Sequence, residues 1–385
     1  MPDFNSELDQ RSLTLHSEAL KSCIRERIDK QHDISFAQFM QMALYQPGLG
    51  YYSSGMHKFG VQGDFVTAPE LGDLFAQCVA HQFQQVISLI QAADILELGA
   101  GTGQFCYDCL LELERLDSLP NKYYILEVSA DLKHRQQQKI KLLPPHLHNL
   151  VIWIEQPLEH AFNGVIFANE VVDALAVEVF KFENNQYWQM RVKWQDGFKQ
   201  GWGRFSDQLN TEIKNKNLNL SDGYVSEFSP HLAQWLESIS CGLNKGVILF
   251  VDYGYDRHAY YHAQRNQGTL ICYHKHQANF DYLSHVGLQD ITAFVDFTAL
   301  AQAADDCGMS VDGYTTQAHF LLSLGIQEKL GDSTNDYKNY YRRTTEMKKL
   351  VMPNEMGEKF KVMALSKNLD DELMGFSFSN QLHLL

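Results

Sequence analysis

The sequence predicts an α/β protein with a parallel sheet that helices cover on both faces. Short apolar segments alternate with helical segments from residue 94 onward, as in strands joined by crossover helices. The first of these apolar segments runs directly into a glycine-rich turn. Hydrophobic residues are 45% and charged residues 21% of the 385 residues, an ordinary globular composition. Collagen, long coiled coil and wholesale disorder are therefore excluded.

The first 90 residues are expected to form a unit of helices and loops. Apolar side chains recur at helical spacing through 1–45 and again through 70–91. Between them, 46–70 is rich in glycine and predicts a loop region.

The sheet is expected to come from two stretches of chain, 91–175 and 236–367. Helices are predicted at 104–116 and 130–141. Strands are predicted at 94–98, 123–126, 150–154, 165–168, 247–251 and 359–366.

Two segments interrupt this alternation. Residues 176–235 are predicted to be a β-rich insertion, because three tryptophans and short alternating runs occur within 176–222. Its polar stretch, 206–222, is expected to be a mobile loop. A second insertion, 255–306, is rich in tyrosine and histidine. Such insertions often carry specificity, although they can equally serve only to stabilise the fold.

The charge and hydropathy of the chain narrow its partners. The net charge is −15, which disfavours non-specific binding to nucleic acid and suits a cationic partner, or simply a well-solvated surface. No apolar run approaches the ~18 residues of a membrane span, and the start of the chain resembles neither a secretory signal nor a transit peptide.

Cysteine and histidine spacing predicts no metal site. Cys106 and Cys109 form a C-x-x-C without a second pair, and their helical spacing favours core packing. His274 and His276 form an H-x-H that lacks a third ligand at suitable spacing.

The strongest motif is the turn that follows the first strand. Glu97 precedes Gly99, Gly101 and Gly103, and a helix follows. Glycines let a ligand touch the backbone, and the helix start offers free N–H groups. A dinucleotide fingerprint needs G-x-G-x-x-G, whereas acid-x-G-x-G-x-G is the pattern of methyltransferases that bind S-adenosylmethionine.

A second acid supports this cofactor. Glu127 ends the second strand, where a carboxylate can accept hydrogen bonds from both ribose hydroxyls. Glu127 lies 28 residues after Gly99, whereas a spacing of about 20 residues is typical of dinucleotide-binding proteins. An unrelated α/β protein with a structural glycine turn is the alternative.

Polar residues also follow the later strands. Asn169, Glu170 and Asp173 come after the fourth strand, and Asp252 ends the fifth. Strand ends line the ligand crevice of an open α/β sheet, so these side chains are expected near a methyl acceptor. Glu170 and Asp173 can alternatively cap the next helix.

With these residues in place, the chain resembles the MidA-type class I methyltransferases, relatives of the mitochondrial complex I assembly factor that methylates arginine. The motifs that carry the resemblance occur in order along nearly the whole chain. They are ALYQPGLGYY at 43–52, GDFVTAPELGDLF at 63–75, LELGAGTG at 96–103, ILEVSADLKHRQ at 125–136, ANEVVDALAVEVF at 168–180, VDYGY at 251–255, GTLICYHKH at 268–276, GLQDITAFVDFTAL at 287–300 and MGEKFKVMALSK at 356–367.

The resemblance implies a Rossmann-like class I methyltransferase sheet with family insertions, and 176–235 is large enough that we expect it to bind the acceptor. It also implies that a loop with Gly63, Asp64, Phe65 and Thr67 covers the cofactor, although plain turn chemistry explains that loop equally well. The expected cofactor-binding set is completed by Glu97, Gly99, Ala100, Gly101, Gly103, Glu127, Val128 and Asn169.

The expected activity is S-adenosylmethionine-dependent methylation of a protein arginine, with Glu170, Asp173, Asn169 and Asp252 at the acceptor. The expected setting is the bacterial cytoplasm, with a respiratory NADH dehydrogenase subunit as one acceptor and a homodimer left open. Two alternatives stand beside this reading. One is a non-catalytic assembly factor that binds S-adenosylmethionine, and the other is an NAD(P)-dependent oxidoreductase.

Overall fold

The computed structural model describes residues 4–54, 67–90, 92–275, 277–332 and 336–385. Its centre is an eight-stranded sheet in the order β15-β16-β10-β5-β2-β3-β4, with β14 paired to β10. The strands are β2 (Asp94–Leu98), β3 (Tyr123–Leu126), β4 (Val151–Ile154), β5 (Phe162–Asn169), β10 (Leu243–Tyr255), β14 (Val295–Asp296), β15 (Ser310–Thr316) and β16 (Phe360–Lys367).

The sheet is mixed rather than wholly parallel. Strands β4, β3, β2, β5 and β10 are parallel to one another, whereas β16 is antiparallel to both β10 and β15. The predicted α/β class and the six predicted strands are confirmed, but β15 was not expected. Its sequence, SVDGYTT, holds few apolar residues, because the strand lies at the edge of the sheet.

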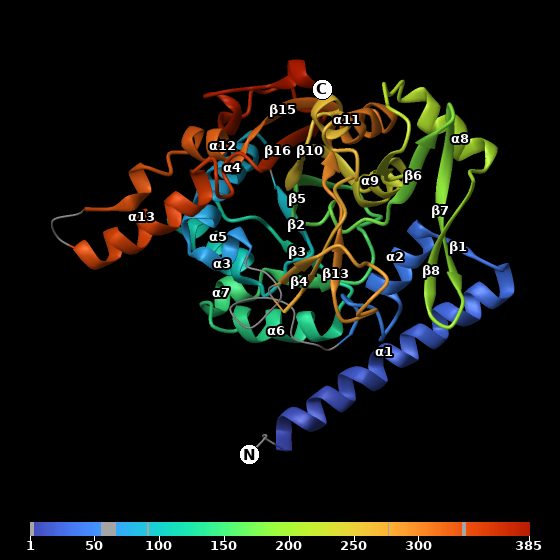
Figure 1. Ribbon diagram of the computed structural model, residues 1–385. Coiled ribbons are helices and arrows are strands. Elements are labelled where there is room, and N and C mark those ends of the chain that lie inside the picture. Colours follow the sequence, from blue (N-terminus) through green and yellow to red (C-terminus); the bar gives the residue numbers. More distant parts are fainter. Residues whose placement is uncertain (1–3, 55–66, 91, 276, 333–335) are drawn as a thin grey trace.

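Helices cover both faces of the sheet (Figure 1). Strand β10 shows why, since Val247, Leu249 and Val251 belong to one buried cluster while Ile248 and Phe250 belong to another. The helices of the first cluster are α4 (Leu74–Leu89), α5 (Gln104–Arg115), α6 (Ala130–Ile140), α12 (Gln317–Ser323) and α13 (Tyr337–Val351). Those of the second are α9 (Leu232–Ser240) and α11 (Phe297–Asp306).

The second insertion is shorter than the expected 255–306. Strand β14 pairs with β10 of the central sheet, and α11 packs in the second cluster, so both belong to the core.

Cys106 and Cys109 are fully buried in the first cluster, which confirms their packing role.

A five-stranded sheet corresponds to the first insertion. It consists of β6 (Glu178–Glu183), β7 (Gln186–Trp194), β8 (Phe198–Arg204) and β9 (Tyr224–Phe228), joined by β1 (Ile34–Ser35) from the N-terminal unit. The expectation of a loop over 206–222 is wrong in part. Ser206 caps a helix, α8 (Asp207–Asn215), whose Ile213 is buried against the sheet.

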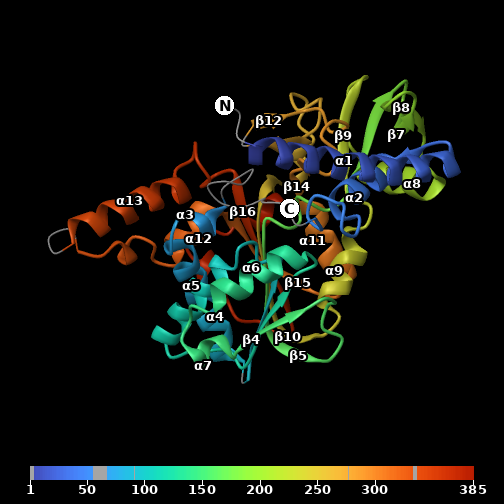
Figure 2. The same cartoon turned by 90° about the horizontal axis from the view of Figure 1, so that it is seen from below.

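The N-terminal helices and the second insertion pack together on this side. Helices α1 (Phe4–Gln31) and α2 (Phe36–Tyr45) share a buried cluster with a three-stranded sheet (Figure 2). That sheet is formed by β11 (Ile271–His274), β12 (Gln277–Asn279) and β13 (Asp290–Thr292). The remaining helices are short: α3 (Ala68–Leu71), α7 (Pro145–His148) and α10 (Arg257–Tyr260). None of the described helices is both long and apolar enough to cross a membrane.

Candidate active site

A cavity of about 600 Å³ opens at the carboxyl ends of the parallel strands. Its walls come from the ends of β2, β3, β5 and β10, from α2 and α3, and from the small sheet of the second insertion. This is the edge at which open α/β sheets bind ligands. The insertion and the N-terminal unit therefore close the crevice that the central sheet creates.

The glycine turn forms one wall of this cavity. Gly99, Gly101 and Gly103 have φ values of 62°, 54° and 82°, which side chains with a Cβ rarely adopt. A Cβ on Gly101 would meet nothing within 4 Å, so it would stand in the open cavity. A Cβ on Gly103 would lie only 3.2 Å from Gln136 Cα. The absence of a side chain at Gly103 therefore lets α5 pack closely on α6.

Glu127 lies at the end of β3, beside this turn. Its Oε1 accepts a hydrogen bond from the Ser129 backbone N–H at 2.8 Å, and its Oε2 accepts one from Gln136 Nε2 at 2.8 Å. The same Gln136 amide donates to the Gly101 carbonyl at 3.0 Å, and Trp153 Nε1 donates to Gln136 Oε1. The strand-end carboxylate is therefore fixed before any ligand arrives, as binding a ribose requires.

Glu97 is buried beneath the turn and also lines the cavity. Its Oε2 accepts a hydrogen bond from the Tyr123 hydroxyl at 2.8 Å. Burial raises the pKa of Glu97 to about 8, and the nearby charge of Glu127 adds to this rise. A cationic amino group of a ligand would stabilise its ionised form.

A strained turn follows β5. Glu170 has a φ of 53°, which is unusual for a residue with a long side chain. Asp252 holds this turn, because its Oδ2 accepts hydrogen bonds from the backbone N–H groups of Val171, Val172 and Asp173 at 2.9–3.2 Å. Its Oδ1 accepts another from the Tyr253 N–H at 2.9 Å.

The turn presents two carboxyl groups to the cavity. Burial raises the pKa of Glu170 to about 8, with a further contribution from the charge of Asp173. Burial also raises the pKa of Asp173 to about 6, against a hydrogen bond from the Tyr253 hydroxyl to its Oδ2. The other carboxylate oxygen of Asp173 and the amide oxygen of Asn169 are buried and accept no hydrogen bond from the described residues. Both are available to a donor on a ligand.

An aromatic and acidic wall faces these carboxyls, and sequence reasoning missed it. Tyr45 and Tyr52 stack with ring centroids 5.5 Å apart, and both line the cavity. The Tyr52 hydroxyl donates to both carboxylate oxygens of Asp290 at 2.9 Å. The sequence offered only one signal, the clustering of tyrosines in 43–52. Neither that clustering nor the distance along the chain to Asp290 indicates a contact.

Most of the predicted site residues meet in this cavity. Those that line it are Thr67, Glu97, Gly99, Ala100, Gly101, Glu127, Val128, Asn169, Glu170 and Asp173. Gly103 does not line the cavity and lies against Gln136. Asp252 does not line the cavity, and its oxygens are taken by backbone N–H groups, so its expected contact with the acceptor is corrected to a positioning role. Gly63, Asp64 and Phe65 lie outside the described residues.

The residues present fit S-adenosylmethionine. The space above Gly101, the fixed carboxylate of Glu127 and the buried acceptor oxygens provide for a ligand with a ribose and a cationic amino group. Comparison with known proteins decides the point. The sequence model of a family described as "Putative S-adenosyl-L-methionine-dependent methyltransferase" matches residues 75–315. The chain belongs to this family.

Solved structures agree with membership of this methyltransferase family. A Burkholderia thailandensis protein, described as a "likely methyl transferase" and bound to S-adenosyl-homocysteine, is 35% identical with a TM-score of 0.92. The match covers 97% of this chain and 98% of that chain. A second crystal structure of a protein from that organism is 34% identical over the same shares, with a TM-score of 0.90. The class I fold and the cofactor expected from the sequence are therefore confirmed.

More distant relatives carry names that specify an acceptor. The mitochondrial "Protein arginine methyltransferase NDUFAF7 homolog" of Caenorhabditis elegans is 26% identical, over 90% of this chain and 86% of its own length. The human "Protein arginine methyltransferase NDUFAF7" is 25% identical, over 88% and 81% respectively. The resemblance stated from the sequence motifs is thus confirmed.

Proposed function

We propose that the protein transfers a methyl group from S-adenosylmethionine to the guanidinium of an arginine in a protein acceptor. The observation that carries the proposal is the pair of carboxyl groups of Glu170, partly buried, and Asp173, buried, beside the glycine turn; one oxygen of Asp173 accepts no hydrogen bond from the described residues. Their raised pKa values mean that burial opposes their negative charge, so a bound cation would stabilise it. The names of the distant relatives support the same acceptor.

The cofactor supplies an electrophilic methyl group on a sulfonium. The chain supplies position: Glu127 accepts hydrogen bonds from the ribose hydroxyls, and the glycine turn admits the ligand against the backbone. Asn169 and Glu97 receive the amino group at the opposite end. Such alignment contributes several orders of magnitude in effective concentration.

The guanidinium is held by the acidic turn. Glu170 and Asp173 accept its N–H groups and direct one nitrogen toward the methyl group, while Tyr45 and Tyr52 offer ring faces to a planar cation. Asp290, held by Tyr52, adds negative charge to the same end of the cavity. Neither Glu170 nor Asp173 needs to be a strong base, because the proton can leave the nitrogen after the methyl group is transferred. Glu170, with its raised pKa, is suited to receive it.

Comparative mass spectrometry of a wild-type strain and a deletion strain tests the acceptor. We expect a methylated arginine that disappears on deletion and returns with a wild-type copy. A respiratory NADH dehydrogenase subunit is the first protein to inspect. Loss of a methylated lysine or small molecule, with methylated arginines unchanged, would contradict the arginine proposal. A deletion that changes no methylated species would favour the non-catalytic alternative.

A further inference from the structure

Helix α13 stands out because it is basic in an acidic protein. Its fifteen residues, YKNYYRRTTEMKKLV, include five lysine or arginine residues and one glutamate, whereas the whole chain has a net charge of −15. Both views show the helix projecting from the body of the molecule (Figures 1 and 2). Tyr337 and Tyr341 are 71% and 64% exposed, and their rings stack on each other. Exposed tyrosines beside cations are typical of interaction surfaces.

One face of α13 borders a second hollow. This hollow, of about 680 Å³, is lined by Leu71 of α3 and by a helical series on α13. The series is Lys338, Asn339, Tyr341, Arg342, Thr345, Glu346 and Lys349, and Asp336 lines the hollow where the helix begins. Spacings of three and four residues place these side chains on one side of the helix. Lys338, Arg342 and Lys349 therefore face the same hollow as Tyr341, beside two acids, and Arg342 is already paired with Asp73 and Glu346.

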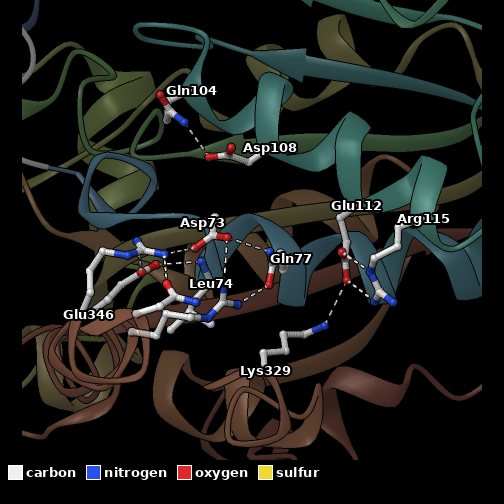
Figure 3. A network of polar contacts seen from close by, with 12 residues as sticks. Asp73, Leu74, Gln77, Gln104, Asp108, Glu112, Arg115, Lys329 and Glu346 are labelled. Carbon is white, nitrogen blue, oxygen red and sulfur yellow. Dashed lines mark hydrogen bonds and ion pairs between the residues drawn. The ribbon is translucent and has the colours of Figure 1, made fainter. Parts of the chain in front are cut away.

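The body of the protein holds α13 firmly. Arg343 forms an ion pair with Asp73 at 2.9 Å, and the buried carboxylate of Glu346 accepts the Leu74 backbone N–H at 2.7 Å (Figure 3). Within the described part of the chain, no such ion pair involves Lys338 or Lys349. The anchoring side of the helix is thus distinct from two lysines that are free to meet a partner.

The second hollow adjoins the active-site cavity. Helix α3 is four residues long, and its Pro69 and Glu70 line the cavity while the next residue, Leu71, lines the hollow. The Thr102 hydroxyl donates a hydrogen bond to Glu70, which ties α3 to the glycine turn. Four helical residues span only about 6 Å. A single extended peptide can therefore reach both places.

We propose that the face of α13 formed by Lys338, Tyr341, Arg342 and Lys349 binds an acidic segment of the acceptor protein, a few residues from the arginine to be methylated. The location of the arginine rests on the proposed function. Recognition is then bipartite: the cation enters the acidic cavity, and the acidic flank meets the basic helix across α3. The negative charge of the rest of the chain disfavours a long polyanion such as RNA, which would extend past the helix.

Fluorescently labelled peptides test this surface. Each carries one arginine and, two to four residues away, either four glutamates or four glutamines. The variants are Lys338→Glu/Lys349→Glu and a control, Lys122→Glu/Lys141→Glu. The control makes the same change in net charge at exposed lysines that line neither hollow. Binding is measured by anisotropy, and methyl transfer to the same peptides is measured separately at saturating peptide.

We expect the wild type and the control to bind the glutamate peptide at least about fivefold more tightly than the glutamine peptide, a preference that the α13 variant loses. Equal binding of the two peptides by the wild type, or the same loss in both variants, would overturn the docking surface. So would tighter binding of an RNA oligonucleotide of equal charge. Charge-dependent binding without any methyl transfer would instead count against arginine as the acceptor.

Discussion

Gln136 Nε2 lies 2.8 Å from Glu127 Oε2 and 3.0 Å from the Gly101 carbonyl oxygen. A single amide on α6 therefore joins the carboxylate at the end of β3 to the glycine turn after β2. Trp153 fixes the other end of the amide through its indole N–H. The spacing between the two parts of the proposed cofactor site is thus set by a residue that does not line the cavity.

Gln136→Ala should weaken S-adenosyl-homocysteine binding about tenfold, because Glu127 loses one of the donors that orient it. Glu127→Ala should weaken binding more strongly. The Glu127→Ala variant should bind a 2′-deoxy analogue and S-adenosyl-homocysteine with equal affinity, since the carboxylate that accepts the 2′-hydroxyl hydrogen bond is gone. Isothermal titration calorimetry measures both effects, with the exposed Gln138→Ala on the same helix as control. Unchanged selectivity for the hydroxyl would contradict the ribose assignment.

Gly101→Ala should reduce S-adenosyl-homocysteine affinity by more than about tenfold, because its Cβ would occupy the open space above the turn. Backbone strain alone is a competing cause, since Gly101 has a φ of 54°. Gly308→Ala supplies the control, because Gly308 has a φ of 68° and equally free surroundings but does not line the cavity. Both variants should lose similar thermal stability. Equal cofactor affinity in a folded Gly101→Ala would exclude the predicted contact.

Glu170→Gln should keep cofactor affinity and lose most methyl transfer, about a hundredfold in kcat/KM, because a charged partner of the guanidinium is removed. Asp173→Asn should behave alike. In the wild type, kcat/KM should rise with pH through about 6 and about 8 as Asp173 and Glu170 ionise. Glu170→Gln should lack the upper inflection. A wild-type profile without either rise would argue against the acidic clamp.

The same residue predicts an effect on stability. The pKa of Glu170 is about 8 in the folded protein, against an ordinary value of 4.5. Glu170 therefore keeps its proton to a higher pH in the folded state than in the unfolded chain. The free energy of unfolding should therefore fall as pH rises between these values. Glu170→Gln should remove this part of the fall, so its melting temperature should exceed that of the wild type at pH 9. Parallel melting curves for the two proteins at all pH values would refute the shift.

Asp252→Ala should destabilise the protein by about 2–4 kcal/mol, because buried backbone N–H groups after β5 lose their acceptor. Asp252→Asn, which keeps one acceptor oxygen, should cost less. Transfer should slow in both as the turn that carries Glu170 relaxes, yet the pH profile should keep its two inflections. Denaturant unfolding and pH–rate profiles measure these effects. Loss of an inflection would instead place Asp252 in direct contact with the acceptor.

The local patterns of the chain were enough to predict six strands of the central sheet and to place Glu97, the glycine turn and Glu127 at one cavity. Glu97, the glycine turn and Glu127 are tied to strand ends, and strand ends of a parallel sheet meet at one edge by geometry alone. Ser206 illustrates a weaker signal. The polar stretch that follows it looked like a loop, but capping by Ser206 and burial of Ile213 make its first half a helix.

The proposed acceptor side was harder to predict from the sequence, because its contacts join segments far apart in the chain. Tyr52 and Asp290 are 238 residues apart, and no periodicity relates them. Asp252 shows a different difficulty. Its place at a strand end predicted a contact with the acceptor, whereas the structure shows that its oxygens accept backbone N–H groups.

Transfer of a deuterated methyl group from labelled S-adenosylmethionine tests the central claim most directly. The purified protein is incubated with lysate from a deletion strain, and the digested proteins are analysed by mass spectrometry, with Glu170→Gln in parallel. The account predicts deuterated methyl groups on arginine in a small set of proteins, strongly reduced with the variant. Label found on lysine or small molecules alone, or equal labelling by the variant, would contradict it.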